Sequence, residues 1–212
     1  MADAPLVHIV DDDEAVRDSL SVLLESADLS VRTYESATAF LDALPGLGAG
    51  CVLTDVQMPG LDGLALQRRL TALGIRLPVI VMTGHGDVPI AVEALKAGAA
   101  DFLEKPFDDA QLLSAVQSAL AASRRTQDAD AATAQIARRL ASLTPREREV
   151  LDKLVAGQPN KTIAYDLGSS PRTVEVHRAR VMEKMGVRSL AELVRMTIAV
   201  ERSAPPGKAP GR

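Results

Sequence analysis

Aromatic residues and cysteine are scarce in this 212-residue chain. It has no tryptophan, two tyrosines, three phenylalanines and one cysteine, so its cores must be built mostly from Leu, Val, Ile, Met and Ala. The single cysteine, Cys51, excludes an internal disulfide and a thiolate metal cluster, which fits a reducing compartment. Hydrophobic residues make up 47% and charged residues 25% of the chain. This balance excludes a wholly disordered or low-complexity protein.

Long hydrophobic runs are also missing. No charge-free stretch approaches the roughly 20 residues that a membrane helix needs. The first residues, MADAPLVHIVDDD, lack the basic segment of a secretory signal and reach three aspartates before any long apolar run. The sequence therefore predicts a cytoplasmic protein with no membrane partner.

The net charge of -4 combines two halves of opposite sign. Residues 1–123 carry 18 acidic and 7 basic side chains, whereas residues 124–212 carry 10 acidic and 17 basic side chains. The overall acidity argues against a nucleic-acid binder, but the basic half taken alone does not. The charge pattern therefore predicts an acidic module tethered to a basic one.

The first module alternates short apolar runs with amphipathic stretches of helical spacing. Runs such as LVHIV and PVIVM are too short for helices and too continuous for half-exposed strands, which favours a parallel sheet buried on both faces. The alternation predicts an α/β, doubly wound, five-stranded parallel sheet whose functional site lies at the carboxyl ends of the strands. The predicted strands are Leu6–Val10, Ser30–Tyr34, Cys51–Thr54, Val79–Met82 and Phe102–Leu103.

The second module has no strand pattern and predicts a smaller all-α, four-helix domain. We expect a first domain over residues 4–122, a helical linker over 123–141, the helical domain over 142–202 and a disordered tail over 203–212. Four signals mark the helix starts. They are Thr144 and Pro145 with Glu147 for the first helix, Asn160 as the cap of the second, Ser170 and Pro171 for the third, and Ser189 for the fourth.

Several acidic side chains follow the predicted strands of the first module. Crowded carboxylates repel one another unless a divalent cation binds, and hard oxygen ligands suit Mg²⁺. A lysine and a threonine at the same edge are suited to holding phosphoryl oxygens, and aspartate is a competent phosphoryl acceptor. We therefore expect Asp55 to be the acceptor, and Lys105 to precede a cis proline, Pro106. The residues at the strand ends are Asp11, Asp12, Asp55, Thr83 and Lys105, whereas Asp13 is expected to cap the first helix.

Four segments resemble the receiver domain of two-component response regulators. They are VDDD (residues 10–13), TDVQMPGLDG (54–63), MTGHGD (82–87) and FLEKPF (102–107). The resemblance implies that a sensor histidine kinase phosphorylates Asp55. It further implies that Asp11, Asp12, Asp55 and the backbone carbonyl of Gln57 bind Mg²⁺, that Thr83 and Phe102 form the switch pair, and that Lys105 contacts the phosphoryl group.

The segment MTGHGDVPIAVEALKAGA is similar to the FixJ subfamily, which regulates nitrogen-fixation genes and pairs with an oxygen-sensing, FixL-like kinase. This resemblance implies a homodimer formed on phosphorylation through the fourth helix and fifth strand. The dimer face would include Val88, Val92, Leu95 and Lys96, although Val92 and Leu95 are equally compatible with the core. We further hypothesise that Gln57 and His85 tune the attack of water on the phosphoryl group.

The third helix of the basic module has a thin apolar seam, Val174, Val181 and Met185, beneath a basic outer face. Charge alone favours a solvated surface helix. The segment from Thr144 to Ser189, however, resembles the LuxR-type helix-turn-helix, which implies a recognition helix over residues 171–185 braced by residues 160–167.

The same resemblance assigns DNA contacts in the basic module. Lys161, Thr173 and His177 would contact phosphates, whereas Glu175, Val176 and Ala179 would face the bases. A glutamate accepts a hydrogen bond from cytosine N4, and valine contacts a thymine methyl. Many relatives carry lysine where this chain has Glu175 and Ala179, so their base preference does not transfer. Arg178 and Arg180 either read guanine or add attraction to phosphates.

These features predict a response regulator rather than an enzyme. Phosphorylation of Asp55 would promote dimerisation, relieve inhibition of the basic module by the acidic one, and switch on promoter binding and transcription activation with RNA polymerase. A first alternative is a Mg²⁺-dependent aspartyl-phosphate hydrolase, but such enzymes use a second aspartate where this chain has Gln57. The second alternative is a signalling adaptor that does not bind DNA, which leaves the basic helix unexplained.

Overall fold

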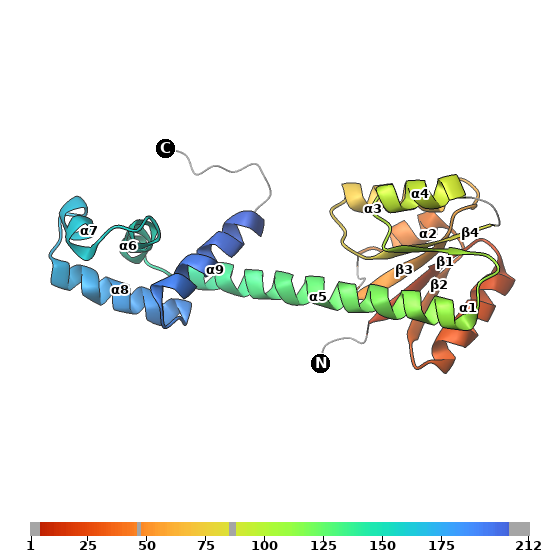
Figure 1. Ribbon diagram of the computed structural model, residues 1–212, viewed down its shortest axis with the longest axis horizontal. Coiled ribbons are helices and arrows are strands. Elements are labelled where there is room, and N and C mark those ends of the chain that lie inside the picture. Colours follow the sequence, from red (N-terminus) through yellow and green to blue (C-terminus); the bar gives the residue numbers. More distant parts are fainter. Residues whose placement is uncertain (1–4, 46–47, 85–87, 204–212) are drawn as a thin grey trace. The chain divides into compact units, whose positions relative to one another are not determined.

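The computed structural model describes residues 5–45, 48–84 and 88–203, and the chain divides into two compact units, residues 1–128 and 129–212. The first unit contains a five-stranded parallel sheet and the second contains helices only (Figure 1). In the described residues, no helix is both long enough and apolar enough to cross a membrane.

The sheet of the first unit confirms the five predicted strands. They are β1 (Leu6–Val10), β2 (Ser30–Tyr34), β3 (Gly50–Asp55), β4 (Val79–Thr83) and β5 (Asp101–Glu104), and all neighbours in the order β2-β1-β3-β4-β5 are parallel. Gly50 starts β3 opposite Leu6, and a Cβ atom there would lie 2.0 Å from the Leu6 carbonyl oxygen. Only glycine therefore lets β1 and β3 begin in this register.

Helices cover both faces of the sheet, as the doubly wound prediction requires (Figure 1). Val7 and Ile9 of β1 belong to the core on the side of α1 and α5, whereas Val10 belongs to the core on the side of α2 and α3. This alternation along β1 follows from the pleat of a strand. The helices are α1 (Glu14–Ser26), α2 (Ala37–Asp42), α3 (Gly63–Ala72), α4 (Val88–Lys96) and α5 (Asp109–Ala141).

Local signals in the first unit hold at the positions that the sequence predicts. The Asp13 side chain caps α1 by accepting a hydrogen bond from the backbone N–H of Ala15 at 2.9 Å. The Lys105-Pro106 peptide bond is cis. Cys51 is fully buried in β3, and this burial raises the pKa of its thiol to about 12. Cys51 is therefore a packing residue, because the reactive thiolate form is suppressed.

The second unit contains α6 (Pro145–Val155), α7 (Asn160–Asp166), α8 (Pro171–Met185) and α9 (Leu190–Ser203). The predicted start of α6 is confirmed as a capping box between Thr144 and Glu147, and Ser170 caps α8. One prediction is wrong: Asn160 is the first residue of α7, and Pro159 precedes it as the cap. Pro159 has the extended backbone of a cap residue, and its carbonyl accepts the first helical hydrogen bonds, so no side-chain cap is needed.

The core of the second unit joins α6, α8 and α9 to the last turns of α5. The predicted seam of α8 is confirmed, since Val174, Val181 and Met185 are all buried. Ile136 and Leu140 of α5 pack against the cluster that contains Val181 and Met185. The second unit therefore includes part of the segment that the sequence analysis assigned to a linker. Most of the predicted tail, residues 204–212, lies outside the described residues.

A buried histidine lies in the sheet away from the carboxyl ends of the strands. His8 is fully buried in β1, its Nδ1 lies 3.3 Å from the Tyr34 hydroxyl, and its ring packs edge-on against Phe40. Its Nε2 atom is buried and has no hydrogen-bond partner among the described residues. Burial first, and the charge of Arg32 second, lower the pKa of His8 to about 4.

This low pKa predicts acid sensitivity of the first unit. The folded state favours neutral His8, so its contribution to stability is complete above the unfolded pKa of about 6.5 and is lost as the pH falls toward 4. At about pH 5 the loss in unfolding free energy should be about 2 kcal/mol. Urea unfolding of the wild-type chain and of His8→Gln at about pH 7.5 and pH 5 measures this loss in unfolding free energy. Equal pH dependence of the two proteins would contradict this assignment.

Candidate functional site

Acidic and basic side chains meet at the carboxyl ends of β1, β3 and β5. Lys105 Nζ donates to Asp55 Oδ1 at 2.5 Å and to Asp11 Oδ2 at 3.3 Å. Asp11 is 2% exposed and Asp55 is 8% exposed, so two buried carboxylates share one ammonium group. The parallel sheet produces this arrangement because residues 11, 55 and 105 each lie at or just beyond the carboxyl end of their strands.

Backbone groups fix the two carboxylates. Asp11 Oδ1 accepts from the N–H of Asp13 at 2.9 Å, and Asp55 Oδ2 accepts from the N–H of Gln57 at 2.6 Å. At the start of α3, a Cβ atom on Gly63 would lie 2.2 Å from the Asp55 carbonyl oxygen, so only glycine lets α3 approach this closely. The position of Asp55 is therefore set by its own strand, the following turn and α3.

The electrostatics of the site favour receipt of a negatively charged group. Burial raises the pKa of Asp11, although the N–H of Asp13 and the charge of Lys105 oppose the rise. Burial works to lower the pKa of Lys105, but the hydrogen bond and charge of Asp55, and then those of Asp11, raise it overall. Lys105 is therefore held in its charged form beside Asp55, where it can neutralise charge added to that carboxylate.

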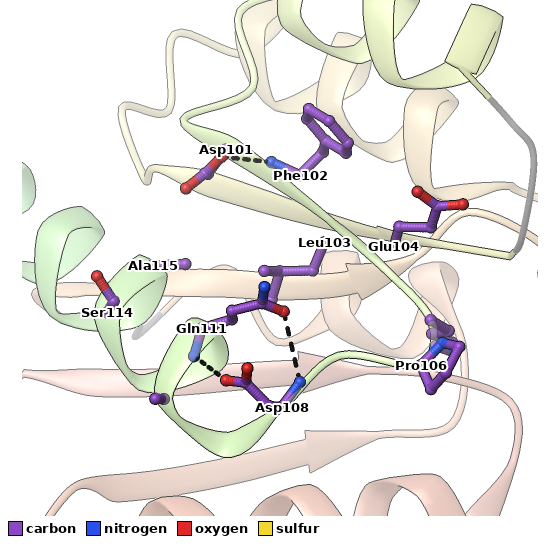
Figure 2. Close-up of a pocket in the computed structure, with 11 residues that line it drawn as sticks. Asp101, Phe102, Leu103, Glu104, Pro106, Asp108, Gln111, Ser114 and Ala115 are labelled. Carbon is purple, nitrogen blue, oxygen red and sulfur yellow. Dashed lines mark hydrogen bonds between the residues drawn. The ribbon is translucent and has the colours of Figure 1, made fainter.

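The predicted switch pair lies on the two neighbouring strands β4 and β5. Thr83 is the last residue of β4 and is 2% exposed, and its hydroxyl donates to the Gly84 carbonyl at 3.5 Å. Phe102 is half-buried in β5 and is paired in register with Val81. Its ring points away from Gln111 and Ser114 of α5 (Figure 2). The sheet thus places Thr83 and Phe102 near one another but not in the same register.

Two members of the predicted metal set differ from Asp11 and Asp55 in exposure. The side chains of Asp12 and Gln57 are exposed. Within the described ranges, no group of three or more His, Cys, Asp and Glu side chains is arranged to hold a metal ion. The structure therefore brings two of the three predicted acidic ligands together around Lys105. His85 lies outside the described residues.

A groove of about 830 Å³ runs along β5 and the start of α5 (Figure 2). Two of the residues that line it hold each other: Asp108 Oδ1 accepts from the N–H of Gln111 at 2.7 Å, and Gln111 Oε1 accepts from the N–H of Asp108 at 3.4 Å. The sequence analysis missed this reciprocal cap of α5, although an Asp followed three residues later by Gln is its signature. A smaller groove of about 350 Å³ borders Lys105 and is lined by Ala15, Val16, Ser19, Leu20, Pro106 and Phe107.

The exposed face of α4 contains the two apolar residues that the sequence left either in the core or on a dimer face. Val92 is 44% exposed and Leu95 is 46% exposed, whereas Ala94 is fully buried. Ala94, and not Val92 or Leu95, therefore packs in the core from this part of α4, while Lys96 is also exposed. The side chain of Val88 lies outside the described residues.

Most of the predicted DNA-contact residues lie on the surface of α8. Thr173, Glu175, Val176, Ala179 and Arg180 are exposed, and Lys161 is exposed on α7. Two further residues, His177 and Arg178, are half-buried, and Nδ1 of His177 is buried without a hydrogen-bond partner in the described part of the chain. The first turn of α8 is held by Ser170, whose hydroxyl lies 2.8 Å from that of Thr173.

An ion pair between the buried Glu147 and the exposed Lys184, which the sequence analysis missed, links α6 to the end of α8. Lys184 Nζ donates to Glu147 Oε2 at 2.7 Å and to the Ser142 carbonyl at 3.2 Å. The hydrogen bond from Lys184, together with the backbone N–H of Thr144, lowers the pKa of Glu147 to about 2. The capping-box signal predicted the contact of Glu147 with Thr144, but 37 residues separate Glu147 from Lys184, so no local pattern reveals their pairing.

Comparison with known families matches both units. Residues 7–117 match the response regulator receiver domain, and residues 141–197 match the bacterial regulatory proteins of the luxR family. The chain is 58% identical over 192 residues to the transcriptional regulatory protein FixJ of Azorhizobium caulinodans, covering 91% of each chain. It is 53% identical to FixJ of Bradyrhizobium diazoefficiens, covering 91% of this chain and 94% of that protein.

Solved structures agree with these matches. The response regulator StyR superposes with a TM-score of 0.82 at 42% identity, covering 92% of this chain and 98% of that one. Full-length FixJ from B. japonicum superposes with a TM-score of 0.58 at 51% identity, covering 93% and 98%. These relatives favour a transcriptional regulator over a hydrolase or an adaptor without DNA binding. The chain therefore belongs to the two-component response regulators that join a receiver domain to a LuxR-type DNA-binding domain, as a FixJ-like transcriptional regulator.

Proposed function

We propose that phosphorylation of Asp55 by a sensor histidine kinase switches this regulator into its DNA-binding form. The observation that supports this most directly is the position of Asp55, whose buried carboxylate lies 2.5 Å from Lys105 Nζ at the carboxyl edge of the sheet. The donor would be a phosphohistidine. A carboxylate oxygen of Asp55 attacks phosphorus, the phosphorus–oxygen bond forms, the phosphorus–nitrogen bond breaks, and the departing imidazole is protonated.

The side chains around Asp55 suit this reaction. Phosphorylation adds about two negative charges, and Lys105 supplies a positive charge that needs no further proton uptake. The N–H of Gln57 holds Asp55 Oδ2 and Lys105 holds Oδ1, so the carboxylate that would attack phosphorus is fixed in orientation. The groove bordered by Ala15, Leu20 and Pro106 lies beside Lys105 and offers an apolar surface on which the kinase can dock.

Mg²⁺ fits the chemistry of the site. Asp11 and Asp55 are two buried carboxylates that already share one cation, Lys105, and the exposed Asp12 follows Asp11 in the chain. Hard oxygen donors with room for water are the ligands that Mg²⁺ prefers. We assign the ion to Asp11, Asp12, Asp55 and the backbone carbonyl of Gln57. When bound, it supplies positive charge that offsets the charge of the phosphoryl group.

The switch pair and α4 connect phosphorylation to dimerisation in this proposal. The Thr83 hydroxyl moves toward the phosphoryl group and the half-buried ring of Phe102 turns inward. The exposed apolar side chains of Val92 and Leu95, together with Val88 and Lys96, then form the homodimer face. Exposure of two large apolar residues on one helix supports an interface there.

The absence of an acid at position 57 supports a regulator that dephosphorylates itself rather than a dedicated hydrolase. Gln57 stands where aspartyl-phosphate hydrolases have their second aspartate, and its exposed amide cannot act as a general acid or base. We propose that Gln57 and His85 instead set how readily water attacks the phosphoryl group.

The relatives and the domain plan support the remaining assignments. The FixJ names of several relatives support an oxygen-sensing, FixL-like kinase partner and control of nitrogen-fixation-type genes. Activation of transcription would require promoter DNA and RNA polymerase, which supports a location in the cytoplasm. We propose a receiver over residues 4–122, a helical linker over 123–141 whose last turns pack in the second unit, and a DNA-binding domain over 142–202.

We propose that α8 is the recognition helix and lies in the major groove, with α7 across the backbone. The exposed arc of α8 supports this role, because Glu175, Val176 and Ala179 are free to approach bases. Lys161, Thr173 and His177 would contact phosphates, and the half-buried Arg178 together with the exposed Arg180 would add positive charge.

The acceptor assignment predicts a complete loss of phosphorylation in Asp55→Asn. Treatment with a small phosphoryl donor and Mg²⁺ should phosphorylate the wild-type chain, shift it to a dimer and raise its DNA affinity, since amide nitrogen cannot replace the carboxylate nucleophile. Light scattering measures the dimerisation and fluorescence anisotropy measures the DNA affinity. Asp18→Asn, which makes the same charge change at an exposed position of α1, should behave as wild type. Phosphorylation of Asp55→Asn would refute the assignment.

The DNA interface predicts different effects for two exposed residues of α8. Arg180→Ala should weaken binding to all sequences and reduce the slope of log K against log salt by about 1, because one phosphate contact is lost. Glu175→Gln should relax the preference at one base pair by about 1–3 kcal/mol with little change in slope. Anisotropy titrations at several salt concentrations measure both, with Arg125→Ala of α5 as the charge-matched control. A slope unchanged by Arg180→Ala would exclude its phosphate contact.

Inhibition of the basic module by the acidic one predicts that a segment starting at about residue 124 binds promoter DNA without phosphorylation. This segment retains the last turns of α5 that pack in the second unit. The unphosphorylated full chain should bind the same DNA at least tenfold more weakly in the same titration. Equal affinities would show that the receiver does not inhibit DNA binding.

A further inference from the structure

The carboxyl end of α8 is held by a residue outside the helix-turn-helix. Helix α8 ends at Met185, and Gly186 follows in the left-handed conformation with φ 68° and ψ 35°. The last carbonyl groups of a helix have no partner within it and attract cations. Arg139 Nη1, from the last turns of α5, donates to the Met185 carbonyl at 2.6 Å.

Apolar packing fixes Arg139 in place for this contact. Ile136 and Leu140, on either side of Arg139 in α5, pack against the cluster that contains Val181 and Met185 of α8. The guanidinium group therefore reaches the end of α8 from a helix that already lies against it. The hydrogen bond has a preferred geometry, so it fixes the position of α8 along α5 more closely than apolar packing alone would.

Gly186 provides the space that the guanidinium group occupies. A Cβ atom at position 186 would lie 2.8 Å from Arg139 Nη1 and 3.3 Å from Arg139 Cζ. The left-handed backbone alone favours glycine here, but the close approach gives a second and independent reason. Arg139 and Gly186 are therefore complementary, and a side chain at position 186 would displace the arginine from Met185.

The geometry points to Arg139 as a positioning residue for DNA recognition, and this inference rests on the proposed role of α8. Arg139 fixes the end of α8 against α5, so the base-facing residues keep their angle to the groove. Thr173 lies about 18 Å from Met185 along the helix, so a tilt of about 10° at Met185 would move it by about 3 Å. This displacement equals the length of a hydrogen bond.

Lys184 makes a different attachment at the same end of α8. It contacts Glu147 and the Ser142 carbonyl, and so joins α8 to α6 and to the turn before it. Arg139 instead joins α8 to α5. Lys184 and the Met185 carbonyl are neighbours in α8, but they connect the recognition helix to different helices. Loss of Arg139 should therefore loosen α8 without unfolding the helix-turn-helix.

The test compares Arg139→Ala with Arg138→Ala in the phosphorylated full chain. Arg138 is the adjacent arginine, is exposed, and donates to Gln135 within its own helix. The probe is a duplex selected from a random library by the wild-type protein, and anisotropy is recorded over a salt series. Arg139→Ala should bind the selected duplex about tenfold more weakly, which corresponds to loss of one charge-assisted hydrogen bond. Its salt slope should match that of the wild type, and the affinity of Arg138→Ala should lie within twofold of the wild-type affinity.

Two further variants separate positioning from folding. Arg139→Lys keeps a cationic donor and should recover part of the affinity. Gly186→Ala displaces the guanidinium group and also strains the left-handed backbone, so its loss should be smaller in the Arg139→Ala background than in the wild type. Far-UV circular dichroism at the assay temperature checks that the variants are folded, and if Arg139→Ala unfolds the second unit, Arg139→Lys makes the comparison.

Three outcomes would overturn the inference. Wild-type affinity in folded Arg139→Ala would show that Arg139 does not position α8. A salt slope reduced by about 1 would show that Arg139 contacts DNA directly. Failure of the phosphorylated wild-type chain to select or bind any duplex would overturn the role of α8 as well, which distinguishes failure of the proposed function from failure of this inference.

Discussion

The contact of one ammonium group, Lys105, with two buried carboxylates, Asp11 and Asp55, is the interaction on which the receiver site depends. Neither carboxylate is stable as an isolated buried charge, because transfer of an ion from water to a protein interior is costly. Shared between them, Lys105 offsets this cost and is itself held charged. The parallel sheet makes the sharing possible, since it carries residues 44 and 50 positions apart to one edge. Charge added to Asp55 in the proposed phosphorylation would disturb this balance, which is how the site would serve as a switch.

A related constraint operates in the second unit. Glu147 is a buried carboxylate that receives hydrogen bonds from Lys184 and from the backbone of Thr144, and these contacts keep its pKa near 2. In the receiver, charge compensation surrounds Asp55, the proposed acceptor. In the helical unit, it fixes the beginning of α6 and the end of α8. The same chemistry therefore surrounds the proposed acceptor in one unit and fixes helix geometry in the other.

Local patterns in the sequence predicted much of the fold. Period and composition located the five strands. The cap residues Asp13, Thr144 and Ser170 located the starts of three helices, because a cap is a contact within three residues along the chain. Prediction was less successful where two neighbouring residues can each take the cap position. Pro159 already provides the extended backbone at the start of α7, so Asn160 is helical. The site residues Asp11, Asp55 and Lys105 were recognisable because parallel topology brings strand ends together. Contacts such as Glu147 with Lys184 leave no local signal and were missed.

The sequence by itself determined the two-domain plan, the opposite charges of its halves and the seam of α8, and it pointed to the proposed acceptor aspartate, because each rests on periodicity, on local motifs or on the order of strands. Tertiary structure alone decided which residues of α4 face solvent, that Asp12 is exposed while Asp11 is buried, and that Arg139 meets the end of α8. Burial and distant pairing depend on how whole elements pack in three dimensions. A helical period shows that a helix has an apolar side, but only packing shows where that side ends and which charge lies opposite it.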